Sequence, residues 1–245
     1  MAISEVGAGT QRAQGTFDNL STPGNVAFPG NVVSGSQLVV GGVTWKADVA
    51  EVPVITDTLG TSYTVVNVLF GTNFRIFIAF GLAPSSGANT VSVDHTAAHY
   101  FSYSIDEFSG PHATPLDVDG GSSTGTSTTP QDDILTVAAD DLIIGVMGFS
   151  NFSNVTLAPG GSYTQIGEEE DNLNHVAHNM VFRIVTTPTT YTVDWTTGSS
   201  VSWIAQTMAF KPAAAAGGRI MSSLAGSGGL AGHGGIAGPG GGLAG

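Results

Sequence analysis

The chain contains no cysteine, so it can form neither a disulfide framework nor a thiolate metal site. Basic side chains are scarce as well: six Lys and Arg stand against nineteen Asp and Glu, which gives a net charge of −13. Nucleic-acid binding depends on clustered basic side chains that replace counterions, and attraction to anionic lipid depends on the same groups. The composition therefore argues against nucleic acid and anionic membranes as partners.

Long apolar runs and leader-like segments are also lacking. Residues 1–20 have no basic segment followed by an apolar one, as a secretory signal would require. No apolar run reaches the roughly 20 residues that a membrane-spanning helix needs. We therefore expect no signal peptide and no membrane insertion. Since the chain also has no HExxH motif and no phosphate-binding loop, we expect a non-enzymatic protein without a cofactor.

Glycine is abundant, with 35 of 245 residues, and 41% of the residues are apolar while only 10% are charged. Low charge, Gly-rich turns and many Thr and Val residues are typical of short strands rather than helices. In Phe74–Phe80, bulky apolar residues alternate in the way that places them on one face of a strand. Similar segments recur between Asn31 and Lys211. They predict an all-β fold, a two-sheet antiparallel sandwich of the jelly-roll or Greek-key type.

Composition divides the chain into three segments. Residues 1–30 are polar and Gly-rich, which favours an N-terminal arm, and residues 31–213 carry the strand pattern of the sandwich domain. Residues 214–245 form a Gly- and Ala-rich tail, in which an aliphatic residue recurs at every sixth position with one slip at Gly240. Because six is a multiple of two and of three, an extended strand or a threefold helix would place the first three aliphatics on one face. We predict that the tail is an assembly element anchored by Leu224, Leu230, Ile236 and Leu243.

Three stretches of the sequence carry a resemblance to a known module. They are ITDTLGTSYT at 55–64, GANTVSV and YSIDEFSG within 87–110, and VSWIAQTMAFKPA at 201–213. Together they resemble a β-sandwich module of bacterial and tailed-phage sequences, in which a strand ends in Glu-aromatic-Ser-Gly and the last strand ends in Phe-Lys-Pro. The resemblance covers residues 31–213 and implies a β-sandwich without assigned catalysis. The tail resembles the Gly-rich ends of phage structural proteins.

The resemblance and the tail lead to two functional hypotheses. The first is a virion structural protein that decorates the phage capsid or forms part of a head or tail fibre, anchored by its termini after assembly in the host cytoplasm. Its partners would be other virion proteins and further copies of itself, in a homotrimer by analogy with other jelly rolls. The alternative is a carbohydrate-binding adhesin, a receptor-binding module that recognises host surface glycans.

Acidic residues offer several candidate sites. The loop at 168–171 (Glu-Glu-Glu-Asp) has the hard oxygen ligands that Ca²⁺ prefers but lacks the alternating spacing of an EF-hand, so a solvated acidic loop is the favoured interpretation. Asp106 and Glu107 are adjacent on a strand and point to opposite faces, which favours structural roles. Acidic residues also flank the Ser- and Thr-rich segment GGSSTGTSTTP at 120–130, where sugar or cation binding is conceivable but a role of the Asp residues in turns is favoured. These acids are Asp117, Asp119, Asp132, Asp133, Asp140 and Asp141.

Histidine and tryptophan give weaker signals. His95 and His99 lie four residues apart and His175 and His178 three apart, but in strands these spacings do not bring two imidazoles onto one metal. We therefore expect no metal site at either pair. The tryptophans are expected to lie in the core rather than on a ligand platform. They are Trp45, Trp195 and Trp203.

Overall fold

The computed structural model describes residues 2–45, 51–136, 138–150, 155–169 and 176–214. The predicted all-β antiparallel sandwich is confirmed, since nearly all regular structure in these residues is β-strand. No helix among the described residues has the length and apolar character needed to cross a membrane. The tail residues Leu224, Leu230, Ile236 and Leu243 lie outside the described residues.

The strands fall into two halves of the chain. The first half contains β1 (Ser4–Glu5), the turn segment η1 (Val6–Gly9), β2 (Ala13–Leu20), β3 (Gly24–Ala27), β4 (Gln37–Trp45), β5 (Val54–Asp57), β6 (Thr64–Phe70), β7 (Phe74–Leu82), β8 (Thr90–Asp94) and β9 (His99–Ser109). The second half contains β10 (Pro111–Ser127), β11 (Gln131–Leu135), β12 (Asp141–Ser150), β13 (Leu157–Pro159), β14 (Thr164–Glu169), β15 (Val176–Val185), β16 (Thr190–Thr197) and β17 (Val201–Pro212).

The two halves have the same topology. The first forms a sheet in the order β2-β9-β4-β7-β6, with β1 extending β2 along β9, and a smaller sheet in the order β3-β8-β5. The second forms β10-β17-β12-β15-β14 and β11-β16-β13. Each strand from β2 to β9 therefore occupies the place of the strand eight numbers later. Both halves follow the strand order of a jelly roll, so the chain is a tandem pair of jelly rolls.

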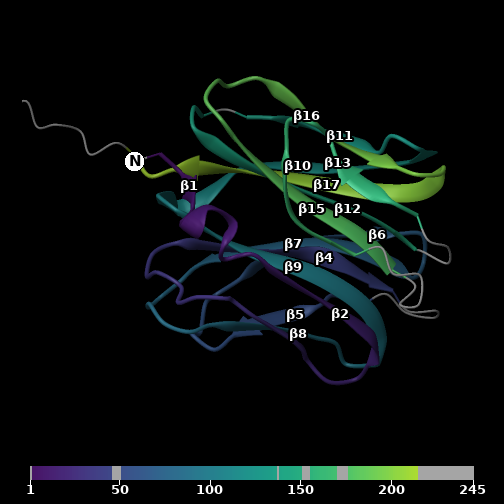
Figure 1. The fold of residues 1–245 in the computed structure, drawn as a ribbon, viewed down its shortest axis with the longest axis horizontal. Helices are drawn as coiled ribbons and strands as arrows, with labels where there is room; N and C mark the ends of the chain where they lie inside the picture. The colour runs from purple at the N-terminus through teal and green to yellow at the C-terminus, as the bar shows by residue number, and fades with distance from the viewer. Residues whose placement is uncertain (1, 46–50, 137, 151–154, 170–175, 215–245) are drawn as a thin grey trace, which may run out of the picture. The chain divides into compact units, whose positions relative to one another are not determined.

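The described residues stack as four layers rather than the two that the sequence predicted (Figure 1). The two large sheets face each other across a central core, which includes Val43, Ile76, Ile144 and Met208. A separate core lies between each large sheet and its own three-stranded sheet. Strand β4 is buried along nearly its whole length because it lies between two of these cores. Strands that are apolar on both faces are the sequence counterpart of a central layer.

The central sheets approach closely at two glycines. A Cβ atom on Gly41 would lie 2.6 Å from a methyl group of Val146, and one on Gly148 would lie 2.3 Å from a methyl group of Val43. These contacts also show that β4 and β12 run in the same direction, since residues 41 and 43 lie opposite 146 and 148. In each half the neighbouring strand, β7 beside β4 and β15 beside β12, runs antiparallel to it.

The common direction gives the body two different ends. At one end, which we call the base, β17 finishes beside the start of the chain, and Ala2 and Ala214 line the same cavity (Figure 1). At the base, the N–H of Ala213 also donates to the carbonyl of Gly110, the residue that joins the two halves. At the opposite end, the loop end, β4 and β12 finish and β9 and β17 begin.

Residues 1–30 differ from the predicted arm. Strand β2 pairs with β9 and strand β3 pairs with β8, so this segment supplies two strands of the first jelly roll. Phe17 stacks on Phe101 with ring centroids 4.8 Å apart, and Val26 is buried in the outer core. The polar, Gly-rich sequence concealed these strands because β2 lies at an edge and buries few of its side chains.

Candidate functional site

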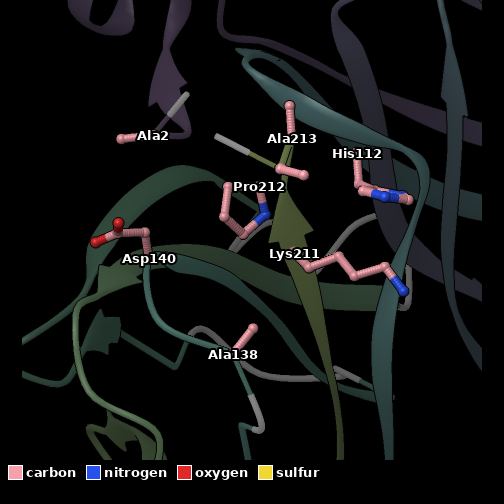
Figure 2. A pocket seen from close by; sticks show the side chains of 8 residues that line it. Ala2, His112, Ala138, Asp140, Lys211, Pro212 and Ala213 are labelled. Atoms are coloured by element: carbon pink, nitrogen blue, oxygen red, sulfur yellow. The ribbon is translucent and has the colours of Figure 1, made fainter. Parts of the chain in front are cut away.

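A cavity of 490 Å³ lies at the base of the body. Asp140 lies on one side of it, and His112 and Lys211 lie on the other (Figure 2). The rest of the lining is Ala138 together with Ala and Pro from the two ends of the described chain, including Ala2 and Ala214. The backbone of Asp140 is left-handed, with φ at 63°, which marks the tight turn that leads into β12. The lining brings together one cationic, one anionic and one imidazole group.

A pair of carboxyl groups stabilises the turn beside this cavity. Burial is the largest cause that raises the pKa of Asp141 to about 7; the charge and hydrogen bond of Asp117 act in the same direction, while Lys211 opposes the shift. An oxygen of Asp141 accepts the N–H of Ala138 at 3.2 Å. The two predicted candidates Asp117 and Asp141 are thus brought together, whereas Asp119 accepts the N–H of Gly121 in a local turn. The hydrogen bond between the two carboxyl groups gives the pair a structural role.

A second buried carboxylate belongs to the base and the central interface. Asp106 has no exposed surface, and one of its oxygens lies 3.5 Å from Nε of Arg12, which also donates to Glu5 at 2.6 Å. Burial is the largest cause that raises the pKa of Asp106 to about 8; the neighbouring Glu5 acts in the same direction, while the N–H of Glu107 and the charge of Arg12 oppose the shift. Arg12 also donates to the carbonyl of Gln165 at 2.7 Å and so connects the two jelly rolls.

Replacement of Asp106 by asparagine is expected to stabilise the protein at neutral and alkaline pH. Between about pH 4 and 8 the folded protein holds a proton on Asp106 that the unfolded chain releases, so this residue reduces stability as pH rises. Asparagine keeps the oxygen that accepts the N–H of Glu107 and does not titrate. The melting temperature of Asp106→Asn should exceed that of the parent by a margin that grows from pH 5 to pH 8. A constant margin would contradict the raised pKa.

A buried histidine bridges the two large sheets at the centre of the body. The Nδ1 atom of His178 lies 2.5 Å from Oγ of Ser102, and its Nε2 atom lies 2.9 Å from Oγ of Ser104. All three side chains are fully buried, and burial lowers the pKa of His178 to about 3. A serine hydrogen-bonded to histidine is the start of a nucleophilic dyad. Here the three side chains are enclosed between β9 and β15, so their hydrogen bonds hold the layers together.

The other histidine spacing noted in the sequence is that of His95 and His99. His95 and His99 stack with ring centroids 4.5 Å apart, while His175 lies outside the described residues. Burial lowers the pKa of His95 to about 3, and the neighbouring His99 adds to this effect. Parallel rings direct their nitrogens side by side rather than at one point, and in the described residues no three His, Asp or Glu side chains could hold a metal. This pair fills the outer core of the first jelly roll.

The acidic loop at 168–171 is described only through Glu169. Glu168 accepts a hydrogen bond from Asn179 at 3.1 Å, and its backbone forms two bonds with the side chain of Gln14 at 2.6 and 2.8 Å. Glu169 accepts a hydrogen bond from Thr16. These contacts join β14 to β2 and to β15. Sequence reasoning missed Arg12, Gln14 and Thr16 as partners because they lie in the segment that was predicted to be an arm.

The remaining candidate acids also have local partners. Asp132 accepts hydrogen bonds from Ser123 at 2.6 Å and Thr207 at 2.8 Å, and Asp133 accepts one from Thr192 at 2.6 Å. Residues 121–125 read Gly-Ser-Ser-Thr-Gly, the spacing of a nucleophile elbow, but they lie within strand β10 instead of a strand-to-helix turn. Ser123 is therefore a hydrogen-bond donor to Asp132 in this geometry.

Two of the stretches that resemble the β-sandwich module contain carboxylates with several hydrogen-bond partners. In ITDTLGTSYT, the carboxylate of Asp57 accepts bonds from the N–H of Thr61 at 2.9 Å, Tyr63 at 3.0 Å and Asn89 at 2.9 Å. In YSIDEFSG, Glu107 accepts bonds from Val33 and Ser36. Trp195 and Trp203 are buried in the outer core of the second jelly roll, as predicted, whereas Trp45 is half-buried against Tyr100 at the loop end.

The polar groups named above thus form cross-strand and cross-sheet connections, and the cavity at the base brings the side chains of His112, Asp140 and Lys211 around open space. Comparisons of the chain with protein-family models, with curated proteins and with solved structures find no match.

Proposed function

We propose that this protein is a non-enzymatic structural component of a tailed-phage particle, which decorates the capsid or forms part of a head or tail fibre. The observation that carries the proposal is how the buried polar groups are used. Arg12 and His178 connect one jelly roll to the other instead of lining a cavity. A protein that must stay rigid between neighbours benefits from such connections, because each buried polar group is expensive unless it is paired.

The two ends of the body support an anchored orientation. Ala2 and Ala214 lie together at the base, so the two ends of the described chain lie on one side of the body. Under this proposal the base faces the particle and the loop end projects. The tail aliphatics then act as anchors that join this chain to other virion proteins and to further copies, in a homotrimer.

The anchoring part of the proposal predicts the outcome of a double substitution in the tail. Leu230→Asp with Ile236→Asp places two charges where aliphatic side chains are expected to be buried, and each lost burial removes about 1.5–3 kcal/mol of favourable transfer energy. We expect loss of self-association by size-exclusion chromatography with light scattering, and an unchanged circular dichroism spectrum. Gly229→Ser with Gly235→Ser is the matched control. Assembly that equals that of the parent protein would contradict the anchoring role.

A second candidate function is carbohydrate binding by an adhesin. It is favoured by one observation: Trp45 and Tyr100 are half-buried and tilted against each other, 5.3 Å between ring centroids, at the end that faces away from both termini. Aromatic faces of this kind stack on the apolar faces of sugar rings. Glycan-array binding that disappears in Trp45→Ala would favour the adhesin, whereas binding only to assembled particles would favour the structural protein.

A further inference from the structure

The two jelly rolls meet differently at the two edges of the central interface. At one edge, side chains of Gln14 and Thr16 on β2 bond across to β14. The equivalent edge in the tandem arrangement is formed by β10 and β6, and there two adjoining cavities of 350 and 260 Å³ lie between the strands. We call them together the β6–β10 cleft. The internal repeat thus offers a built-in comparison between a closed edge and an open one.

The start of β10 explains the opening. Between Pro111 and Leu116 the register against β17 shifts, because these residues pair with Pro212 and Phe210. The intervening residues therefore leave the regular hydrogen-bond ladder and form a bulge, which bends β10 away from the adjacent strand. Both cavities share the lining residues Thr64, Phe80, Ala113 and Pro115.

The lining of the cleft is uncharged in a protein with a net charge of −13. Phe80, Leu82, Pro115 and Leu116 supply apolar surface, and Thr64 and Ala113 are exposed at its margin. Each cavity is many times larger than the roughly 30 Å³ that one water molecule occupies. A site of this chemistry suits the aliphatic side chains of a segment whose other residues are small and uncharged.

We infer that the β6–β10 cleft receives aliphatic side chains from residues 222–245 of a second copy of this chain. The inference rests on the proposed anchoring role of the tail. All nineteen side-chain carboxylates precede residue 215, so the tail carries no acidic side chain that an acidic body would repel. Its aliphatic residues are separated by Gly, Ala and Ser, whose small side chains let the backbone lie close to a surface.

The position of the base adds a geometric reason. The described chain ends at Ala214, and Ala213 is hydrogen-bonded to Gly110, three residues before Ala113 in the cleft. The point of departure of one tail and the receiving cleft therefore belong to the same end of the body. Copies that meet through their bases would bring the tail of one close to the cleft of another.

The cleft is tested in the full-length chain by Thr64→Glu with Ala113→Glu, which places two charges at exposed positions of the lining. Ser122→Glu with Thr126→Glu is the matched control, since both residues are exposed on β10 outside the cleft and the charge change is equal. By light scattering over a concentration series, the cleft variant should have the mass of a monomer where the parent and the control are assembled. A cleft variant that assembles like the control would overturn the inference.

Direct binding is measured with a fluorescently labelled peptide of residues 222–245. The receptor is the full-length Leu230→Asp, Ile236→Asp protein, whose own tail competes weakly. Adding Thr64→Glu and Ala113→Glu should weaken binding of the peptide at least tenfold, and a peptide with the same two Asp substitutions should not bind. Equal binding to both receptors would overturn the cleft. If the tail substitutions abolish assembly and the cleft substitutions do not, the anchoring role stands and the cleft is wrong.

Discussion

Replacement of Gly148 by valine is expected to lower the free energy of unfolding by about 3 kcal/mol, the upper part of the range for overpacked cores. A Cβ atom at this position would lie 2.3 Å from Val43 on the facing sheet and 3.0 Å from the carbonyl oxygen of Ala177 on the neighbouring strand. A methyl group can turn away, but a backbone carbonyl in a sheet cannot move without breaking its ladder. The two large sheets must therefore separate or the strand must bend.

Urea denaturation followed by tryptophan fluorescence measures this effect. Valine has a higher strand propensity than glycine, so a loss of stability cannot come from local preference. Gly161→Ala is the control, because an added Cβ there meets nothing within 4 Å. A Gly148→Val protein within 0.5 kcal/mol of the parent, on the order of an ordinary surface substitution, would show that the layers are not in close contact.

The second large effect concerns pH and His178. Its pKa is about 3 in the folded protein and near 6.5 in an unfolded chain. Between these values the unfolded chain binds one more proton, so the stability that His178 supplies is complete above pH 6.5 and is lost as pH falls toward 3. The loss amounts to about 1.4 kcal/mol per pH unit, or about 3 kcal/mol between pH 6.5 and 4.

Comparison with His178→Gln isolates this contribution. Glutamine can bond to Ser102 and Ser104 but does not titrate, so the variant should be less stable than the parent at pH 7 and should approach it by pH 4. His95, Asp106 and Asp141 titrate in both proteins, and their contributions cancel in the difference. Urea unfolding at pH 7, 5.5 and 4 gives the three free energies. Parallel curves for the two proteins would mean that His178 is not buried in its neutral form.

The strand pattern was largely readable from the sequence because both faces of the central strands are apolar. Phe74–Phe80, whose alternating bulky residues predict a strand, lies within β7. The tandem repeat was missed, although it leaves a signal: Leu-Val-Val-Gly at 38–41 recurs as Leu-Ile-Ile-Gly at 142–145, and Ser-Tyr-Thr at 62–64 recurs at 162–164. Comparison of the chain with itself would have indicated four layers instead of two.

The polar connections could not be predicted in the same way. His178 meets Ser102 and Ser104 across more than seventy residues of sequence, and no spacing rule links residues on different sheets. The same holds for Arg12 and Gln165, whose contact depends on how the two jelly rolls pack. Predictions for single strands follow from periodicity, whereas contacts between layers require the relative placement of the sheets.

Because the two jelly rolls lie in one chain, their pairing does not depend on protein concentration. Two separate jelly rolls that met through their large sheets would form a dimer, and their pairing would depend on protein concentration. Here Gly110 joins them directly, between β9 and β10, so the second half is always present at a high effective concentration for the first. The interface that involves Val43 and Gly148 is therefore complete in a single newly made molecule, and the folded unit can persist at concentrations far below those at which copies of it meet.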